Sequence, residues 1–198
     1  MHHQREHIPQ PLTFRTLRGQ RVAARQAMEA DTPLLAELLG QLSERARHLR
    51  YMSSRHFSAE GIWSEAIRMT RGLSPDHTTL VATKQLNEYH EVIAVAELVR
   101  DQHDPTVAEI ALVVRDDEQQ QGIGMFLLRH LVGLAQSSDI RCLSASMLAE
   151  NSAMLRLIRT LGLPYTATTR YGETQVLISL PGHHAEIAPA RSATKLAA

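Results

Sequence analysis

The 198-residue sequence is poor in features that would place a protein in a membrane or in an oxidising compartment. Its single cysteine, Cys142, excludes an internal disulfide and is typical of a reducing cytoplasm, where we expect the protein to reside. No apolar run approaches the roughly 18 residues that a membrane-spanning helix needs, and the N-terminus lacks the apolar core of a signal peptide. The 21 Lys and Arg residues balance 21 Asp and Glu residues, so no global field favours nucleic acid or an anionic membrane.

Several ligand-binding signatures are absent as well. A nucleotide P-loop needs a Gly-Lys-Ser/Thr tripeptide, which the sequence does not contain. A dinucleotide fingerprint that starts at Gly122 and Gly124 would need a third glycine where the chain has Leu127. The eleven histidines show no spacing typical of metal ligands, so we expect no metal.

The most informative stretch that is present runs from Glu109 to Gly124. An apolar, β-branched segment leads through polar residues into a glycine pair, and the glycines open an amphipathic helix. A strand, a tight turn and a helix N-terminus together form an anion site, because the first helical N–H groups lack intrahelical partners. Glycine has no Cβ and lets a phosphate approach the backbone. We therefore predict a phosphate-bearing ligand at the amides of residues 120–125.

A second strand–helix unit follows. Residues 142–147 are typical of a short strand, and the pattern predicts a helix over residues 151–163. Asn151 is a good N-cap, and Gly162 followed by Pro164 is a good helix stop.

Both units resemble motifs of the GNAT superfamily, the acyl-CoA-dependent N-acyltransferases. The sequence Gln119-x-x-Gly122-x-Gly124 is similar to the family's pyrophosphate loop, Gln/Arg-x-x-Gly-x-Gly/Ala. Val114 stands at the family's valine, eight residues before the first glycine. Asn151 begins a stretch similar to the family's second motif, which Met154 and residues 161–163 also fit. The resemblance covers roughly residues 20 to 180.

The resemblance implies an α/β (α+β) fold, with a mixed, mostly antiparallel central sheet flanked by about four helices. The sequence pattern predicts the order β-α-α-β-β-β-α-β-α-β-β. We expect a flexible segment over residues 1–20, the acetyltransferase domain over 21–180 and a flexible tail over 181–198. Residues 43–57 are predicted to form a basic, irregular connector, followed by a helix to about Arg71 that buries Trp63.

Acetyl-CoA is the co-substrate that the resemblance implies. Its pantetheine arm is expected along the strand that ends at Val114, whose backbone N–H groups are also expected to stabilise the oxyanion. Asn151 is expected to bind the CoA arm, to cap its helix, or to do both. The expected cofactor contacts are Leu112, Val113, Val114, Gln119, Gln120, Gln121, Gly122, Ile123, Gly124, Met125 and Asn151.

Acetyl transfer to an amine requires a base, because an ammonium group has no lone pair with which to attack. The resemblance assigns this role to Glu109, and the apolar residues beside it would raise its pKa toward neutrality. The alternatives are an exposed carboxylate without a role and, as a different base, Glu97. Many family members also carry a tyrosine that protonates the leaving thiolate, but here that position is Ile158. Tyr165 and Tyr171 are substitutes only by residue type.

The acceptor is the least determined part of the reaction. Residues 42–52 are similar to a segment of bacterial protein acetyltransferase domains, which act on protein lysines. Arg45, Arg50 and Arg55 are predicted to face an acidic patch on a protein substrate, although a solvated charged face explains them equally well. Three functions remain open: a protein-lysine acetyltransferase, a small-molecule amine acetyltransferase, and a CoA-binding regulatory module without turnover. We expect no nucleic-acid or membrane partner, and the oligomeric state is left open.

Overall fold

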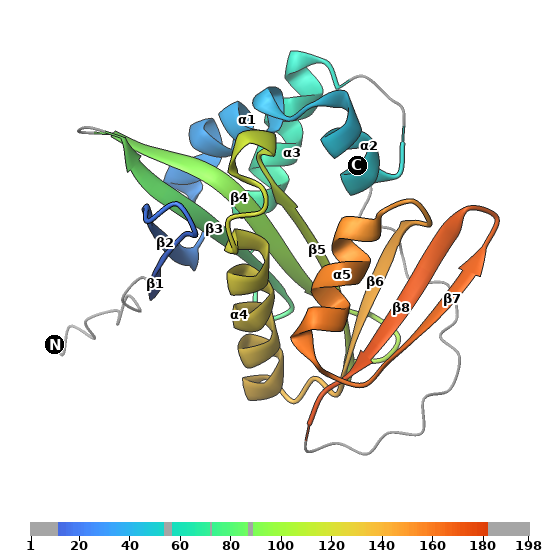
Figure 1. Ribbon diagram of the computed structural model, residues 1–198. Coiled ribbons are helices and arrows are strands. Elements are labelled where there is room, and N and C mark those ends of the chain that lie inside the picture. The colour runs from blue at the N-terminus through green and yellow to red at the C-terminus, as the bar shows by residue number, and fades with distance from the viewer. Residues whose placement is uncertain (1–11, 54–56, 72, 87–88, 182–198) are drawn as a thin grey trace, which may run out of the picture.

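The computed structural model describes residues 12–53, 57–71, 73–86 and 89–181 (Figure 1). The described residues form five α-helices and eight strands in one sheet. The helices are α1 (Thr32–Gln41), α2 (Glu44–Tyr51), α3 (Ala59–Arg71), α4 (Ile123–Ser137) and α5 (Ser152–Leu161). The strands are β1 (Leu12–Arg15), β2 (Arg21–Gln26), β3 (His77–Leu86), β4 (Tyr89–Arg100), β5 (Val107–Val114), β6 (Cys142–Leu148), β7 (Tyr165–Arg170) and β8 (Glu173–Ser179).

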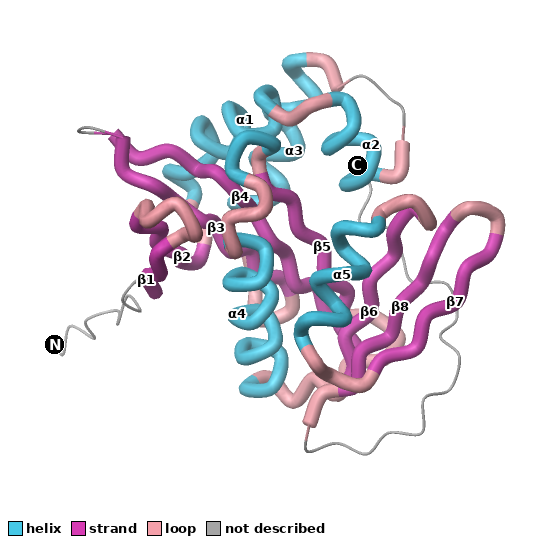
Figure 2. Tube along the Cα trace, in the orientation of Figure 1, coloured by secondary structure: helices cyan, strands magenta, loops and turns pink. Residues whose placement is uncertain are grey.

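The sheet has the order β1-β2-β3-β4-β5-β6-β8-β7. Every neighbouring pair is antiparallel except β5 and β6, which are parallel, so the predicted mixed and mostly antiparallel sheet is confirmed. The β5–β6 pairing covers only residues 107–109 of β5 and 142–144 of β6. Beyond Glu109 the two strands diverge, as Figure 2 shows, and this divergence determines where the site lies.

Two hydrophobic layers cover the sheet, one on each face. Helix α4 buries Leu127, Leu128 and Leu131 on the face that also receives Ile110 of β5. On the opposite face, α1 and α3 pack against residues such as Val113 of β5. Because successive strand residues point to opposite faces, β5 contributes to both layers. Figure 1 shows α4 and α5 together on the near face and α1 and α3 behind the sheet.

The N-terminal half departs from the predicted element order. Strand β1 lies within residues 1–20, the segment that was expected to be flexible. It pairs with β2, so the sheet begins before residue 21. The expected irregular connector contains helix α2, because Ser43 caps it: its hydroxyl accepts a hydrogen bond from the Ala46 amide at 3.1 Å. The prediction that α3 buries Trp63 is wrong, since this side chain is 47% exposed.

The C-terminal half follows the predictions closely. The Asn151 side chain accepts a hydrogen bond from the Met154 amide at 3.1 Å and caps α5. The helix ends at Gly162, whose φ of 76° lies in the left-handed region that glycine adopts without strain. Among the described residues, no helix is long and apolar enough to cross a membrane.

Candidate active site

A cavity of about 580 Å³ opens where β5 and β6 diverge. Strand β5 and the start of α4 form one side, and β6 with the first turns of α5 forms the other. Helix α2 lies close to both strands and closes one end. The lining segments are residues 45–46, 49–50, 110–114, 118–120, 122–125, 145–147, 150–154, 156–157 and 160.

The predicted anion site lies at the start of α4. Gly122 is the N-cap of this helix with a φ of 86°, a conformation that favours glycine. At Gly124 the space is limited for a different reason: a Cβ there would stand 3.2 Å from the Leu157 side chain of α5, which would have to shift. The first N–H groups of a helix lack intrahelical acceptors, so this turn fits the phosphates of a CoA molecule.

The three consecutive glutamines before Gly122 have different environments. Gln119 donates a side-chain hydrogen bond to the Val114 carbonyl at 3.0 Å and closes the turn after β5. Gln121 is buried and does not line the cavity; its side-chain oxygen accepts a hydrogen bond from the Arg18 amide at 3.1 Å. Gln120 lines the cavity with an exposed side chain and a φ of 58°. Of the three side chains, that of Gln120 is therefore the one best placed to reach a ligand.

The β5 edge beyond Glu109 faces the cavity instead of a neighbouring strand. Its backbone groups on that side are available to an extended ligand, which would lie between the strands like an added strand. Asn151 lines the same cavity while its Oδ1 caps α5. The cap is thus present, and it leaves the Asn151 side-chain amide at the cavity.

Glu109 lies at the point where the two strands part. It is the last residue of β5 that pairs with β6, opposite Ser144, and it precedes the cavity-lining segment 110–114. Its carboxyl is half-buried, and this burial raises its pKa to about 7. The positive charge of Arg50 opposes this rise, while the negative charges of Asp101 and Glu97 add to it. A carboxyl with such a pKa can accept a proton near neutral pH.

Glu97, the alternative base, lies in a different environment. Its side chain is fully buried, forms ion pairs with Arg50 and with Arg68 at 2.9 Å, and shares a hydrogen bond with His77 at 3.0 Å. Burial alone would raise its pKa, but the His77 hydrogen bond and the two arginine charges outweigh burial and lower the pKa to about 2. Glu97 is therefore charged at any physiological pH and is a poor proton acceptor.

The three arginines predicted to face a protein substrate are not equivalent. Arg45 is exposed and lines the cavity, which agrees with a position at its rim. Arg50 also lines the cavity, but its side chain is only 3% exposed because it pairs with Glu97 inside the protein. The expectation that Arg50 faces an acidic patch on a partner is thus wrong. Arg55 lies outside the described residues.

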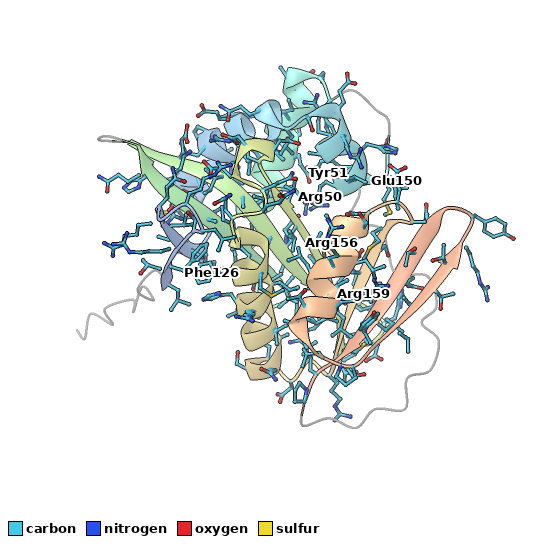
Figure 3. The ribbon with its side chains drawn as sticks, viewed as in Figure 1. Arg50, Tyr51, Phe126, Glu150, Arg156 and Arg159 are labelled. Atoms are coloured by element: carbon cyan, nitrogen blue, oxygen red, sulfur yellow. The ribbon has the colours of Figure 1, made fainter. Side chains whose placement is uncertain are left out.

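The sequence analysis missed Arg156, which lies on α5 beside the cavity (Figure 3). Ser152, Arg156 and Thr160 all line the cavity and recur every four residues, so they share one face of α5. This four-residue spacing is the sequence pattern from which Arg156 could have been predicted as a site residue. An exposed cation here suits the phosphate-rich end of a CoA molecule.

No tyrosine among the described residues lines the cavity. Ile158 is fully buried in the core. The Tyr165 hydroxyl accepts a hydrogen bond from Arg159 at 3.3 Å, outside the cavity, and Tyr171 is fully exposed at the β7–β8 turn. Over the same part of the chain, no three His, Cys, Asp or Glu side chains gather in a way that could hold a metal ion.

Comparisons with known proteins agree with this geometry. The chain is 38% identical over 87 residues to the acetyltransferase Pat of Mycolicibacterium smegmatis, and the match covers 44% of this chain and 26% of that protein. The fold is similar to the crystal structure of the GNAT domain of S. lividans PAT, with a TM-score of 0.73 and 22% identity over 86% of this chain and 97% of that one. It is also similar to a cAMP-binding acyltransferase from Mycobacterium smegmatis, with a TM-score of 0.57 and 24% identity over 86% of this chain and 47% of that one.

The chain thus corresponds to about a quarter of the Pat protein and to less than half of the cAMP-binding acyltransferase, whereas the S. lividans domain matches almost end to end. The model of the acetyltransferase (GNAT) family matches residues 37–163, which is more than half of the chain. This match contains the cavity, the glycine turn of α4 and Glu109, and the chain therefore belongs to the acetyltransferase (GNAT) family, whose members are acyl-CoA-dependent N-acetyltransferases.

Proposed function

We propose that the protein transfers an acetyl group from acetyl-CoA to the side-chain amine of a lysine in a protein substrate. Transfer occurs by direct attack of the amine while both substrates are bound. The observation that carries this proposal is the position of Glu109, a half-buried carboxyl with a pKa of about 7 where β5 and β6 part, directly before the cavity-lining segment 110–114.

Each part of the cavity has a task in this reaction. Acetyl-CoA supplies the thioester when bound. The amides at the start of α4 and Arg156 hold its phosphates, and the open edge of β5 orients its arm. Glu109 takes a proton from the substrate ammonium, so that the amine nitrogen can form a bond to the carbonyl carbon. A backbone N–H among Leu112–Val114 stabilises the charge that develops on the carbonyl oxygen.

The C–S bond then breaks, the newly bonded nitrogen loses its second proton to water, and the thiolate receives a proton from water. Solvent has this role because no tyrosine of the described residues lines the cavity. Water is a weaker donor than a positioned phenol, so we expect slower turnover than in family members that carry the tyrosine.

A protein acceptor is favoured by the similarity to Pat and by Arg45 at the rim of the cavity. The decisive experiment incubates a bacterial lysate with the protein and isotope-labelled acetyl-CoA, followed by mass spectrometry. We expect label on protein lysines. Label only on small amines would assign the alternative acetyltransferase function, and no label despite CoA binding would assign a regulatory module.

Binding of CoA is tested separately from turnover. A ligand that binds only the folded protein adds about 2.7 kcal/mol to the free energy of unfolding at 100 times its Kd, which thermal melting detects. Gly124→Trp should abolish this stabilisation, because a Cβ at this position already lies 3.2 Å from the Leu157 side chain and the bulky indole would fill the turn. Gly133→Trp is the matched control: it lies on the same helix at an exposed position with open space around it. Equal stabilisation of both variants by CoA would contradict the assigned phosphate site.

A further inference from the structure

Arg50 occupies an unusual position between the cavity and the interior. It lies in the last turn of α2, lines the cavity, and yet has a side chain that is only 3% exposed. One guanidinium nitrogen, Nη2, donates to the Glu97 carboxylate. The Nε atom is buried and has no hydrogen-bond partner among the described residues. Arg50 therefore has one engaged end and one donor that is unused.

The engaged end is held firmly. Glu97 also receives hydrogen bonds from Arg68 at 3.0 Å and is bonded to His77 at 3.0 Å. Arg68 in turn binds Glu65 through two nitrogens, both at 2.8 Å. Because Glu97 is permanently charged, the position of the Arg50 guanidinium does not depend on pH in the physiological range.

The strand register places this network beside Glu109. Glu97 of β4 pairs with Ala111 of β5, and Val99 pairs with Glu109. Glu97 and Glu109 thus lie on the same face of two adjacent strands, diagonally across one pair. Figure 3 shows Arg50 where α2 approaches this face, beyond Arg156 of α5.

The charges that act on Glu109 come from two elements. Arg50 of α2 is the cation, and Glu97 of β4 and Asp101 just after β4 are the anions. The residue opposite on β6 is Ser144, which is uncharged. Two carboxylates on one half-buried face disfavour each other's ionisation unless a cation stands near both. Arg50 is the cation that meets this condition.

We propose that Arg50, fixed by its ion pair with Glu97, is a positioning residue that keeps the Glu109 carboxylate available as a proton acceptor. This inference rests on the proposed role of Glu109. A cation suits the task, because Arg50 can bind the Glu97 carboxylate while its positive charge also acts on Glu109. The network is therefore part of the reaction and not only of the fold.

The test measures the acid limb of the kcat/KM profile with a substrate found active for the wild type. It also measures the pKa of Glu109 without substrate, by NMR of carboxyl-labelled glutamate assigned with Glu109→Gln. Arg50→Gln should move both to higher pH, on the order of one unit, because it removes the compensating cation. Turnover should then recover at alkaline pH. Arg50→Lys keeps the charge and should stay close to the wild type.

Glu97→Gln should shift the acid limb of the kcat/KM profile and the pKa of Glu109 in the opposite direction. It removes the negative charge that opposes ionisation of Glu109 and leaves Arg50 less neutralised, so both the limb and the pKa should move to lower pH. In the double variant Arg50→Gln/Glu97→Gln the two shifts should largely cancel. Opposite shifts that cancel are an electrostatic signature, which a purely structural role would not produce. Arg47→Gln is the matched control, since it removes the same charge from the same helix.

Unchanged values in both single variants, or a shift in Arg47→Gln as large as in Arg50→Gln, would overturn the proposal. If Arg50→Gln does not fold, Arg50→Lys and Glu97→Gln carry the test, because each keeps the shape of its side chain approximately. Failure of the proposed function is a separate result: Glu109→Gln would then keep full turnover, whatever the NMR titration shows.

Discussion

Glu97 and Glu109 are the same residue type on the same face of adjacent strands, and they have opposite properties. Glu97 is fully buried and has a pKa lowered to about 2, while Glu109 is half-buried and has a pKa raised to about 7. The more deeply buried carboxylate is thus the more acidic one. The two residues differ in their partners. Glu97 has two arginines and a histidine within hydrogen-bond distance. For Glu109, the charge of one arginine lowers the pKa, and the charges of two carboxylates raise it.

This contrast teaches that burial alone does not identify a catalytic carboxylate. Burial disfavours the charged form of both residues, but it produces a base only where the compensating hydrogen bonds are missing. The protein places the compensated carboxylate next to the uncompensated one, with Arg50 as the link.

The largest expected effect comes from Glu109→Gln, which keeps the shape of the side chain and removes the proton acceptor. Turnover at neutral pH should fall on the order of 10²- to 10⁴-fold, while CoA affinity stays nearly constant. The loss should shrink as pH rises, because solvent then supplies the free amine. Steady-state kinetics with calorimetric CoA titration measures both quantities, and wild-type turnover in this variant would remove Glu109 from the mechanism.

The second effect concerns stability. Glu97→Ala leaves Arg50 and part of the charge of Arg68 buried without a partner, and should lower the free energy of unfolding by roughly 3–5 kcal/mol. Glu29→Ala is the comparison: its ion pair with Arg71 is largely exposed, so the loss should be about 0–1 kcal/mol. Urea denaturation followed by circular dichroism measures both variants. Similar losses would mean that the buried network does not stabilise the fold.

The third effect is a pH dependence with opposite signs for the two carboxylates. Glu97 has a folded pKa below its ordinary value of 4.5, so its contribution is complete above pH 4.5 and is lost as pH falls toward 2. Glu109 has a folded pKa above 4.5, so folding favours its protonated form. Its contribution is present below pH 4.5 and is lost as pH rises to about 7, with a slope of at most about 1.4 kcal/mol per pH unit.

Glu109→Gln should therefore remove a decline in the free energy of unfolding between pH 4.5 and 7. Urea denaturation of wild type and variant across this range gives the difference directly. A difference that does not change with pH would mean that Glu109 titrates at its ordinary value in the folded protein.

The smallest effect is expected from Tyr165→Phe. If Glu109 is the residue that handles protons in the cavity, a hydroxyl outside the cavity has no part in turnover. We expect kcat within about two-fold of the wild type, a difference too small for the loss of a general acid. A decrease of 100-fold or more would make Tyr165 the thiolate donor and would require α5 to move.

The sequence predicted the second half of the fold well for a physical reason. Between residues 107 and 180 the structure depends on local signals, such as the cap at Asn151 and the left-handed stop at Gly162, and these act within one turn of the helix. The same locality made the glycine turn of α4 recognisable.

The first half depends on contacts between residues far apart in the chain. Strand β1 exists because it pairs with β2 and stacks Phe14 on Phe126 of α4, a distance of 112 residues along the chain that no local pattern reveals. The basic composition of residues 43–57 suggested an irregular connector, yet Arg50 is buried and paired with Glu97, which lies 47 residues later. Only the contacts of Glu97 with Arg50, Arg68 and His77, which come from three different elements, distinguish its environment from that of Glu109.

Three hydrogen bonds connect the segment before the glycine turn to the turn between β1 and β2. The Leu17 and Arg18 amides donate to the backbone and side-chain oxygens of Gln121, and the Arg18 guanidinium donates to the Asp117 carbonyl. The backbone of the turn before α4 is thus held in shape without a ligand, and its conformational entropy is lost during folding instead of during binding. Removing residues 12–20 would leave every cavity-lining residue in the chain but would remove these hydrogen bonds, so a ligand at this turn would then carry the ordering cost when it binds.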